Sequence, residues 1–272
     1  MSTGDSIDLA VLDWAGTVVD FGCLAPTGAF VQAFAEAGVE ATWTETRRPM
    51  GLHKKDHIRE MLRDPSLASR WKAANGKDWS EADVDSLYLR VTPLQVKAAT
   101  EHADLVPGTL DAIADLRQRG IKIAGSTGYF REAADAVAEH AAAFGYKPDF
   151  NIGADDVPAG RPAPWMIFRS MEHCGVFPPH RVVKVGDTLV DIEDGRNAGV
   201  WSVGVVESSN EMGLSLSEWT SLLAGVKEEK RRAVRERFLD AGADAVIDSI
   251  AGLPGLIDDL NRRLQGGTRP GR

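Results

Sequence analysis

Cysteine is scarce in this chain, and long apolar runs are absent. The 272 residues include two cysteines, Cys23 and Cys174, which lack the Cys-x-x-Cys spacing of a metal or redox motif. No apolar run approaches the roughly 18 residues that a transmembrane helix needs. The N-terminal MSTGDSID has neither the basic nor the apolar region of a signal peptide. We therefore expect a soluble, cytoplasmic protein in a reducing setting, without a membrane partner.

Basic charge is also in short supply, since the formal net charge is −9 and the isoelectric point is about 5.2. The stretch KEEKRRAVRER is the one dense basic segment, and we interpret it as the solvated face of a helix. Nucleic-acid binding requires a basic surface, so no nucleic-acid partner is expected. The hydrophobic content of 43% is enough for the core of one large domain or two modest ones.

Strand-like and helix-like runs alternate along most of the chain. Several helical runs end at a glycine that is followed at once by an apolar strand, which makes a repeated αβ unit. This alternation is typical of an α/β fold, a doubly wound, Rossmann-like parallel sheet with helices on both faces. The expected strands are residues 7–12, 121–125, 150–152, 182–185, 201–206 and 245–247. The expected helices between them are residues 109–119, 131–144, 164–174 and 191–198.

One long segment, from Gly22 to about Val106, breaks this alternation because it holds helical patterns and no convincing strand. These patterns cover residues 26–38, 53–62 and 80–91. Pro93 is expected to kink the last of these helices. We predict an all-α cap of residues 23–102 inserted into an α/β core of residues 1–22 and 103–272. The low-complexity tail GGTRPGR at the end of the core is expected to be disordered.

Polar residues that can carry chemistry lie where the expected strands end. They are Asp13, the pair Thr127–Gly128, Arg161, and Asp187 with Asp191 four residues later. Each alone is explained by an ordinary cap or turn, but ligands of open parallel sheets bind at the carboxyl ends of the strands. Carboxylates at that edge suit Mg²⁺. A hydroxyl, amide N–H groups and a guanidinium suit a phosphoryl group.

Four segments resemble the four motifs of the haloacid dehalogenase superfamily. They are DWAGT at 13–17, Thr127 after its strand, Arg161 in GRPAPW, and GDTLVDIEDG at 186–195. In the phosphatases of that superfamily the first motif is DxDGT, and here Ala15 replaces the second aspartate. That departure, together with MGLHKKDHIREML at 50–62, resembles the phosphonatase family, as do GRPAPWM and NAGVWSVGVV. The resemblance extends to about residue 265.

This resemblance implies Mg²⁺-dependent cleavage of the P–C bond of phosphonoacetaldehyde to acetaldehyde and phosphate. It implies that Asp13 is the nucleophile that forms an aspartyl phosphate, and that Lys54 on the cap forms a Schiff base. His57, one helical turn after Lys54, would move protons. The implied magnesium ligands are Asp13, the Ala15 carbonyl and Asp187, supported by Asp191. The implied substrate contacts are Thr127, Gly128, Arg161, Cys23, Met50 and Tyr129.

The spacing from Met50 favours Lys54 over Lys55 as the reactive lysine, whereas His53 and Lys55 depart from the family pattern and have no assigned role. Family members commonly form homodimers through the cap, so a cap-mediated homodimer is expected. Three aromatic residues could supply its apolar surface or could equally belong to the core. They are Trp71, Trp79 and Tyr88.

The loss of a carboxylate at Ala15 and the presence of Lys54 make chemical sense together. Cleavage of a P–C bond would expel a carbanion, which an acid at position 15 does not stabilise. An imine between a lysine and the neighbouring aldehyde accepts the electron pair and leaves as an enamine. The lysine must be neutral to form it, so its pKa must fall from about 10.4.

A phosphate-ester phosphatase or phosphomutase of the same superfamily is the main alternative, but it predicts an aspartate where Ala15 stands. A serine hydrolase built on AGSTG at 124–128 needs a histidine late in the chain, and none follows His180. A non-catalytic binding protein on this fold would be expected to have a broken set of motifs, yet the other motif positions are filled.

Overall fold

The computed structural model describes residues 5–271, apart from the side chain of Thr100. Its centre is a parallel sheet of six strands in the order β3-β2-β1-β4-β5-β6. The strands are β1 (Leu9–Leu12), β2 (Lys122–Thr127), β3 (Phe150–Gly153), β4 (Val182–Gly186), β5 (Trp201–Val205) and β6 (Ala245–Ile247). All six predicted strands are present, and the doubly wound α/β fold class is confirmed.

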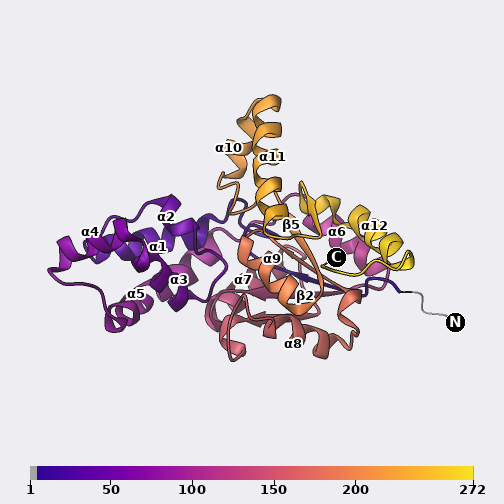
Figure 1. The fold of residues 1–272 in the computed structure, drawn as a ribbon, viewed down its shortest axis with the longest axis horizontal. Coiled ribbons are helices and arrows are strands. Elements are labelled where there is room, and N and C mark those ends of the chain that lie inside the picture. The colour runs from indigo at the N-terminus through magenta and orange to yellow at the C-terminus, as the bar shows by residue number, and fades with distance from the viewer. Residues whose placement is uncertain (1–4, 272) are drawn as a thin grey trace.

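Helices cover both faces of the sheet (Figure 1). The helices of the α/β core are α6 (Thr109–Gln118), α7 (Arg131–Ala143), α8 (Trp165–Cys174), α9 (Leu189–Ala198), α10 (Leu216–Ser221), α11 (Ala224–Asp240) and α12 (Leu253–Gln265). Leu9 and Val11 of β1 pack with α8 and the end of α9. Ala10 and Leu12 pack with α6, α7 and α12 on the opposite face. A strand buried on both faces has a continuous apolar sequence, which explains why this run predicted a central strand.

From β1, the strands β2 and β3 follow on one side of the sheet, and β4, β5 and β6 follow on the other side, so the strand order switches between the neighbours β1 and β4. Such a switch point opens a crevice at the carboxyl ends of the two strands. Asp13 directly follows β1 and Asp187 directly follows β4, so the topology places both carboxylates at this crevice. Thr127 ends β2 on the other side of β1.

The helical segment after β1 forms a separate body beside the sheet, on the left of Figure 1. Its helices are α1 (Leu24–Glu36), α2 (Trp43–Arg47), α3 (Lys54–Arg63), α4 (Pro65–Asn75) and α5 (Glu81–Glu101). They enclose their own hydrophobic cluster, which includes Phe34, Ile58 and Trp71. An inserted all-α cap is therefore confirmed, while its boundaries at residues 23 and 102 remain a prediction. Trp71 is a core residue of the cap, and Trp79 and Tyr88 pack partly buried against it.

Two local expectations are corrected. The helix expected over residues 80–91, with a kink at Pro93, continues through Pro93 to the end of α5, because tertiary packing along α1 offsets the missing backbone hydrogen bond. The C-terminal tail is held on the core, since Arg269 pairs with Asp5 at 2.6 Å and Gly271 N–H donates to Asp244 at 2.8 Å.

The charged stretch predicted as a solvated helix face lies in α11, which projects from the core together with α10 (Figure 1). Along α11 only Val234 and Phe238 are buried, as that interpretation requires. Within residues 5–271, every helix is too short or too polar to cross a bilayer.

Candidate active site

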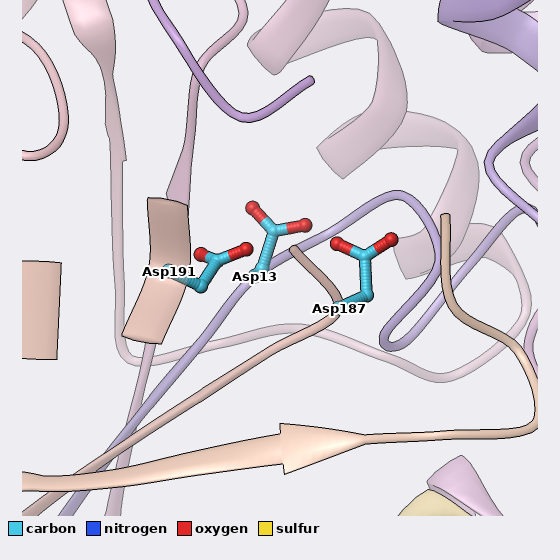
Figure 2. Close-up of side chains that lie close together, drawn as sticks. All are labelled: Asp13, Asp187 and Asp191. Carbon is cyan, nitrogen blue, oxygen red and sulfur yellow. The ribbon is translucent and has the colours of Figure 1, made fainter. Parts of the chain in front are cut away.

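Three carboxyl groups converge at the switch point of the sheet. Asp13 and Asp187 follow β1 and β4, and Asp191 lies in the first turn of α9. Figure 2 shows their carboxyl groups side by side at this edge, and one oxygen of each lies within 4.8 Å of the others. All three are buried. Burial raises the pKa of Asp13. Burial and the charge of Asp13 raise the pKa of Asp187 well above its usual value. A positive charge nearby would therefore stabilise the ionised form of both groups.

Two buried cations supply part of that charge. The Arg161 Nη1 atom lies 2.7 Å from Asp13 Oδ1 and 2.8 Å from Asp191 Oδ1. The Lys184 Nζ atom lies 2.7 Å from the same Asp191 oxygen. Burial by itself would raise the pKa of Asp191, but Arg161 and Lys184 outweigh it and bring that pKa to about 2. Asp191 is therefore ionised and tied to protein groups.

Sequence reasoning missed Lys184 and Asp194. Lys184 is fully buried in the middle of β4, and a lysine inside the apolar strand VVKVG was the signal that could have found it. Asp194 lies on α9 with its Oδ2 atom 3.7 Å from Arg161 Nε. Burial raises the pKa of Asp194 to about 7 although Arg161 opposes the shift. The described cluster thus combines four carboxyl groups with two basic side chains.

This donor set fits a divalent cation that prefers oxygen ligands, such as Mg²⁺. Asp191 Oδ2 accepts from Thr188 Oγ1 at 2.6 Å and its other oxygen faces the two cations, so it is less available as a ligand. Asp13 and Asp187 are the better candidates. Asp187 Oδ2 accepts a hydrogen bond from the backbone N–H of Asn210 at 2.8 Å, which orients that carboxyl group.

A single cavity connects the carboxylates with the cap. Of the predicted site residues, ten line it and two, His57 and Asp191, do not. The ten are Asp13, Ala15, Cys23, Met50, Lys54, Thr127, Gly128, Tyr129, Arg161 and Asp187. Pro26, Gly51 and Thr188 also line it and were not predicted. The cavity volume is about 20 Å³, which is room for about one water molecule.

Lys54 is the first residue of α3 and is only 3% exposed. Its Nζ atom lies 4.9 Å from the ring centre of Tyr129 and 5.6 Å from that of Phe30. Burial lowers the pKa of Lys54 to about 8, against the opposing influence of Cys23 and Asp13. A substantial fraction of this amine is therefore neutral near physiological pH.

The neighbouring lysine has the opposite environment. Lys55 is on the outside of the cap, where its Nζ atom pairs with Asp85 at 2.6 Å. His53 caps the start of α3, because its Nδ1 atom accepts from Lys55 N–H, and its Nε2 atom lies 3.1 Å from Asp155 of the core. The two adjacent lysines thus have different environments, and of the two only Lys54 lines the cavity that holds the carboxylates.

His57 lies one helical turn after Lys54, as predicted, but it is buried in the cap and stacked on Phe30 with 3.8 Å between ring centres. Burial, followed by the charge of Lys54, lowers the pKa of His57 well below its usual range. The ring is therefore neutral, and in this arrangement it stands outside the cavity wall.

The cap turn that carries Met50 packs directly on the core. Gly51 has φ +95°, and a Cβ atom there would lie 2.6 Å from Thr188 Oγ1. A Cβ atom on Gly128 would lie 2.9 Å from the carbonyl oxygens of Gly51 and Leu52. Glycine is required at both positions because the two backbones approach so closely. Gly128 therefore has a packing role in addition to the predicted substrate contact.

Ser126 and Thr127 end β2 beside Arg161. Arg161 Nη2 donates to the Ser126 carbonyl at 2.6 Å and to its hydroxyl at 2.9 Å. Thr127 Oγ1 accepts from Tyr129 N–H at 3.2 Å. The Ser126 hydroxyl thus faces a guanidinium and not a histidine, which leaves the serine-hydrolase alternative without its base.

Comparisons with known proteins show the family to which this chain belongs. A family model described as haloacid dehalogenase-like hydrolase matches residues 7–199. A phosphonoacetaldehyde hydrolase of Bacillus cereus is 42% identical over 257 residues, which cover 94% of this chain and 97% of that protein. A phosphonoacetaldehyde hydrolase of Syntrophobacter fumaroxidans is 43% identical over 264 residues, which cover 97% and 95%.

Solved structures show the same relationship. The crystal structure of a phosphonoacetaldehyde hydrolase-like protein from Oleispira antarctica has a TM-score of 0.96 at 39% identity, covering 98% of this chain and 96% of that one. A β-phosphoglucomutase from Clostridium difficile, at 18% identity and a TM-score of 0.68 over 94% and 98%, shares the fold alone. This protein is therefore an enzyme of the haloacid dehalogenase-like hydrolases and belongs to their phosphonoacetaldehyde hydrolase family.

Proposed function

We propose that this enzyme hydrolyses the P–C bond of phosphonoacetaldehyde to acetaldehyde and phosphate through a Lys54 Schiff base and an Asp13 aspartyl phosphate. One observation carries the proposal: a cavity shared by core and cap is lined by a buried carboxylate, Asp13, a buried lysine, Lys54, and Ala15, which stands where the phosphatases have a second aspartate. A phosphatase of the same fold has no use for that lysine.

Lys54 supplies the electron sink. The neutral amine adds to the aldehyde, and loss of water leaves an iminium next to the P–C bond. When that bond breaks, its electron pair moves into the iminium and forms an enamine. Protonation of the enamine carbon and hydrolysis of the imine release acetaldehyde and restore Lys54. The aromatic surroundings and the lowered pKa of Lys54, about 8, favour the neutral amine that the first step needs.

Asp13 accepts the phosphonyl group. Its carboxylate attacks phosphorus as the P–C bond breaks, and water then cleaves the resulting aspartyl phosphate to phosphate and Asp13. Arg161 and Thr127 lie at the same edge of the sheet and line the same cavity, so they are placed to hold the phosphonyl oxygens. Arg161 also pairs with Asp13 at 2.7 Å, and its charge lowers the pKa of Asp13 against the larger raising effect of burial.

Asp13 and Asp187 would hold Mg²⁺, with the Ala15 carbonyl as a third ligand and Asp191 as their support. When bound, the ion offsets the negative charge of the carboxylates and of the phosphonate, and so permits attack of one anion on another. We propose that His57, one helical turn from Lys54, moves protons during formation of the imine and protonation of the enamine.

Substrate access requires the cap to move. The cavity of about 20 Å³ holds no more than about one water molecule, which is far less than phosphonoacetaldehyde occupies. The described arrangement is therefore a closed one, in which Gly51 and Gly128 bring cap and core backbones into contact. Closure excludes water from the iminium, and opening admits the aldehyde.

Borohydride trapping tests this proposal. It reduces an imine to a stable secondary amine, so protein treated with phosphonoacetaldehyde or acetaldehyde and borohydride should lose activity and gain a covalent adduct. Peptide mass mapping should place the adduct on Lys54 within MGLHKKDH. The adjacent Lys55 is the internal control, because its side chain is partly exposed and paired with Asp85.

An adduct on Lys55 would show that Lys55 and not Lys54 is the reactive lysine, and it would leave the proposed chemistry unchanged. If no lysine is trapped while the enzyme remains active, the Schiff base is ruled out, and the phosphate-ester phosphatase or phosphomutase becomes the better interpretation. Chelation of divalent cations should abolish turnover in either case.

We further propose a cytoplasmic homodimer that forms through the cap, as predicted from the resemblance. Both cysteines are free, which suits a reducing setting. Leu89 on α5 is 73% exposed and is a better candidate for the interface than the buried Trp71. Light scattering of the wild type and of Leu89→Asp tests this, since the variant should shift a dimer toward the monomer.

A further inference from the structure

The loop that joins β5 to α10 contains three consecutive buried polar residues, Ser208, Ser209 and Asn210, to which neither the motifs nor the proposed mechanism gives a role. Ser209 closes the loop on itself, because its hydroxyl donates to Val206 O at 2.7 Å and accepts from Met212 N–H at 2.9 Å. The other two make hydrogen bonds outside the loop. Their partners lie in the active site and in the cap.

Asn210 contacts both of these regions at once. Its backbone N–H donates to Asp187 Oδ2 at 2.8 Å. Its side-chain Nδ2 donates to the Arg47 carbonyl at 3.1 Å, and its Oδ1 accepts from Arg47 Nη1 at 3.2 Å. Arg47 is the last residue of α2 in the cap. One residue of the core thus links a carboxylate of the predicted metal site to a cap helix.

Arg47 extends the link in two directions. Its Nη1 atom donates to the Gly22 carbonyl, in the linker that leads into the cap, at 2.8 Å. Its own carbonyl accepts from Met50 N–H at 3.1 Å, which anchors the cap turn that lines the cavity. Ser208 completes the connection on the core side, since it accepts from Gly22 N–H and donates to the Gly16 carbonyl at 2.6 Å.

We propose that Arg47 and Asn210 are positioning residues that couple closure of the cap to the placement of Asp187. The inference rests on the proposed function, because it assigns Asp187 to the metal. The buried amide of Asn210 has its Arg47 partners only when α2 sits on the core. When the cap opens, Arg47 moves away with α2, and the loop that holds Asp187 loses the hydrogen bonds that fix it from the cap side. The cation site is therefore complete only when the cavity is closed to water.

Calorimetric titration of metal-free protein with Mg²⁺ tests the coupling without relying on turnover. The variants are Arg47→Met, which keeps the aliphatic packing, Asn210→Ala, which keeps the backbone N–H toward Asp187, and the double variant. Arg48→Met is the matched control, because Arg48 is the adjacent arginine and pairs with Asp64 inside the cap at 2.9 Å. Thermal melting of each variant confirms that it is folded.

Each single variant should weaken Mg²⁺ binding about tenfold, the effect of losing a hydrogen bond to a charged group. The double variant should be no weaker than the singles, since the two residues act through one contact. Arg48→Met should bind like the wild type. Unchanged affinity in Arg47→Met, or multiplied losses in the double variant, overturns the coupling, and Arg47→Met alone decides if Asn210→Ala does not fold.

Measurements on the wild type distinguish a failure of the proposed function from a failure of the proposed coupling. If wild-type Lys54 is not trapped by borohydride, or the wild type binds no divalent cation, the proposed function itself fails. If the wild type behaves as proposed and the variants bind Mg²⁺ like Arg48→Met, only the coupling is wrong.

Discussion

The core and the cap both bury ionisable groups at the active site, and the neighbours of those groups affect their charge differently. On the core side, Arg161 and Lys184 lie within 2.8 Å of Asp191 and keep it ionised. On the cap side, Lys54 lies against the rings of Tyr129 and Phe30, and burial lowers its pKa to about 8. In the core, basic neighbours outweigh burial at Asp191 but not at Asp13 or Asp187, whose pKa values burial raises, whereas in the cap burial favours a neutral amine.

This difference teaches that burial by itself does not decide a protonation state. Desolvation disfavours every buried charge, and the neighbouring groups determine whether it wins. A reaction that needs an anionic carboxylate and an uncharged amine can therefore have both in one small cavity, provided that they belong to different environments. Three substitutions and one pH series test this difference between core and cap.

Asp13→Asn should have the largest effect. The amide is a poor nucleophile, so turnover of phosphonoacetaldehyde should fall by at least about 10⁴-fold. The substitution keeps the size of the side chain, so circular dichroism and the melting temperature should show a folded protein. A folded variant with activity near that of the wild type would contradict the mechanism. Borohydride trapping of acetaldehyde on Lys54 should persist, because the cap side is unchanged.

Lys54→Arg should reduce turnover by about 10³-fold or more and abolish the borohydride adduct, since guanidinium stays charged and is not a usable nucleophile. Lys55→Arg is its control and should stay within about twofold of the wild type, as expected for an exposed pair. Steady-state rates and mass spectra measure both. Equal losses in the two variants would contradict the distinction between the buried and the exposed lysine.

The pH dependence should follow the Lys54 amine. Below its pKa of about 8 the amine is protonated and cannot add to an aldehyde, and above it the neutral form dominates. The rate of trapping with acetaldehyde and cyanoborohydride should therefore rise about tenfold per pH unit up to that value and then level off. A rate that keeps rising about tenfold per pH unit well above pH 8 would show that burial does not lower this pKa.

Ala15→Asp tests the proposed activation of the leaving group. It adds an acid that can protonate an alkoxide but cannot stabilise a carbanion, so phosphonoacetaldehyde turnover should not increase. Weak hydrolysis of simple phosphate esters should become measurable with a colorimetric ester. A clear gain in phosphonate turnover would refute the argument that the imine, and not an acid, activates the leaving group.

Much of the fold and of the site could be predicted because its signals are local. Apolar runs such as 201–206 predict strands, and helices closed by glycine predict αβ units. The motif positions then identify the strand-end residues Asp13, Thr127 and Asp187 from the sequence alone. The extent of α5 was not, because packing against α1 overrides the breaking tendency of Pro93.

The sequence by itself determined the doubly wound sheet, the inserted helical cap and the residue types of the cavity, since periodicity and motifs depend on neighbours along the chain. Only the tertiary structure decided which of two adjacent lysines is buried, that Lys184 and Asp194 join the carboxylates, and that Asn210 links Asp187 to Arg47. The physical reason is that burial, pKa and hydrogen-bond partners depend on distances between residues far apart in the chain, which no local pattern encodes.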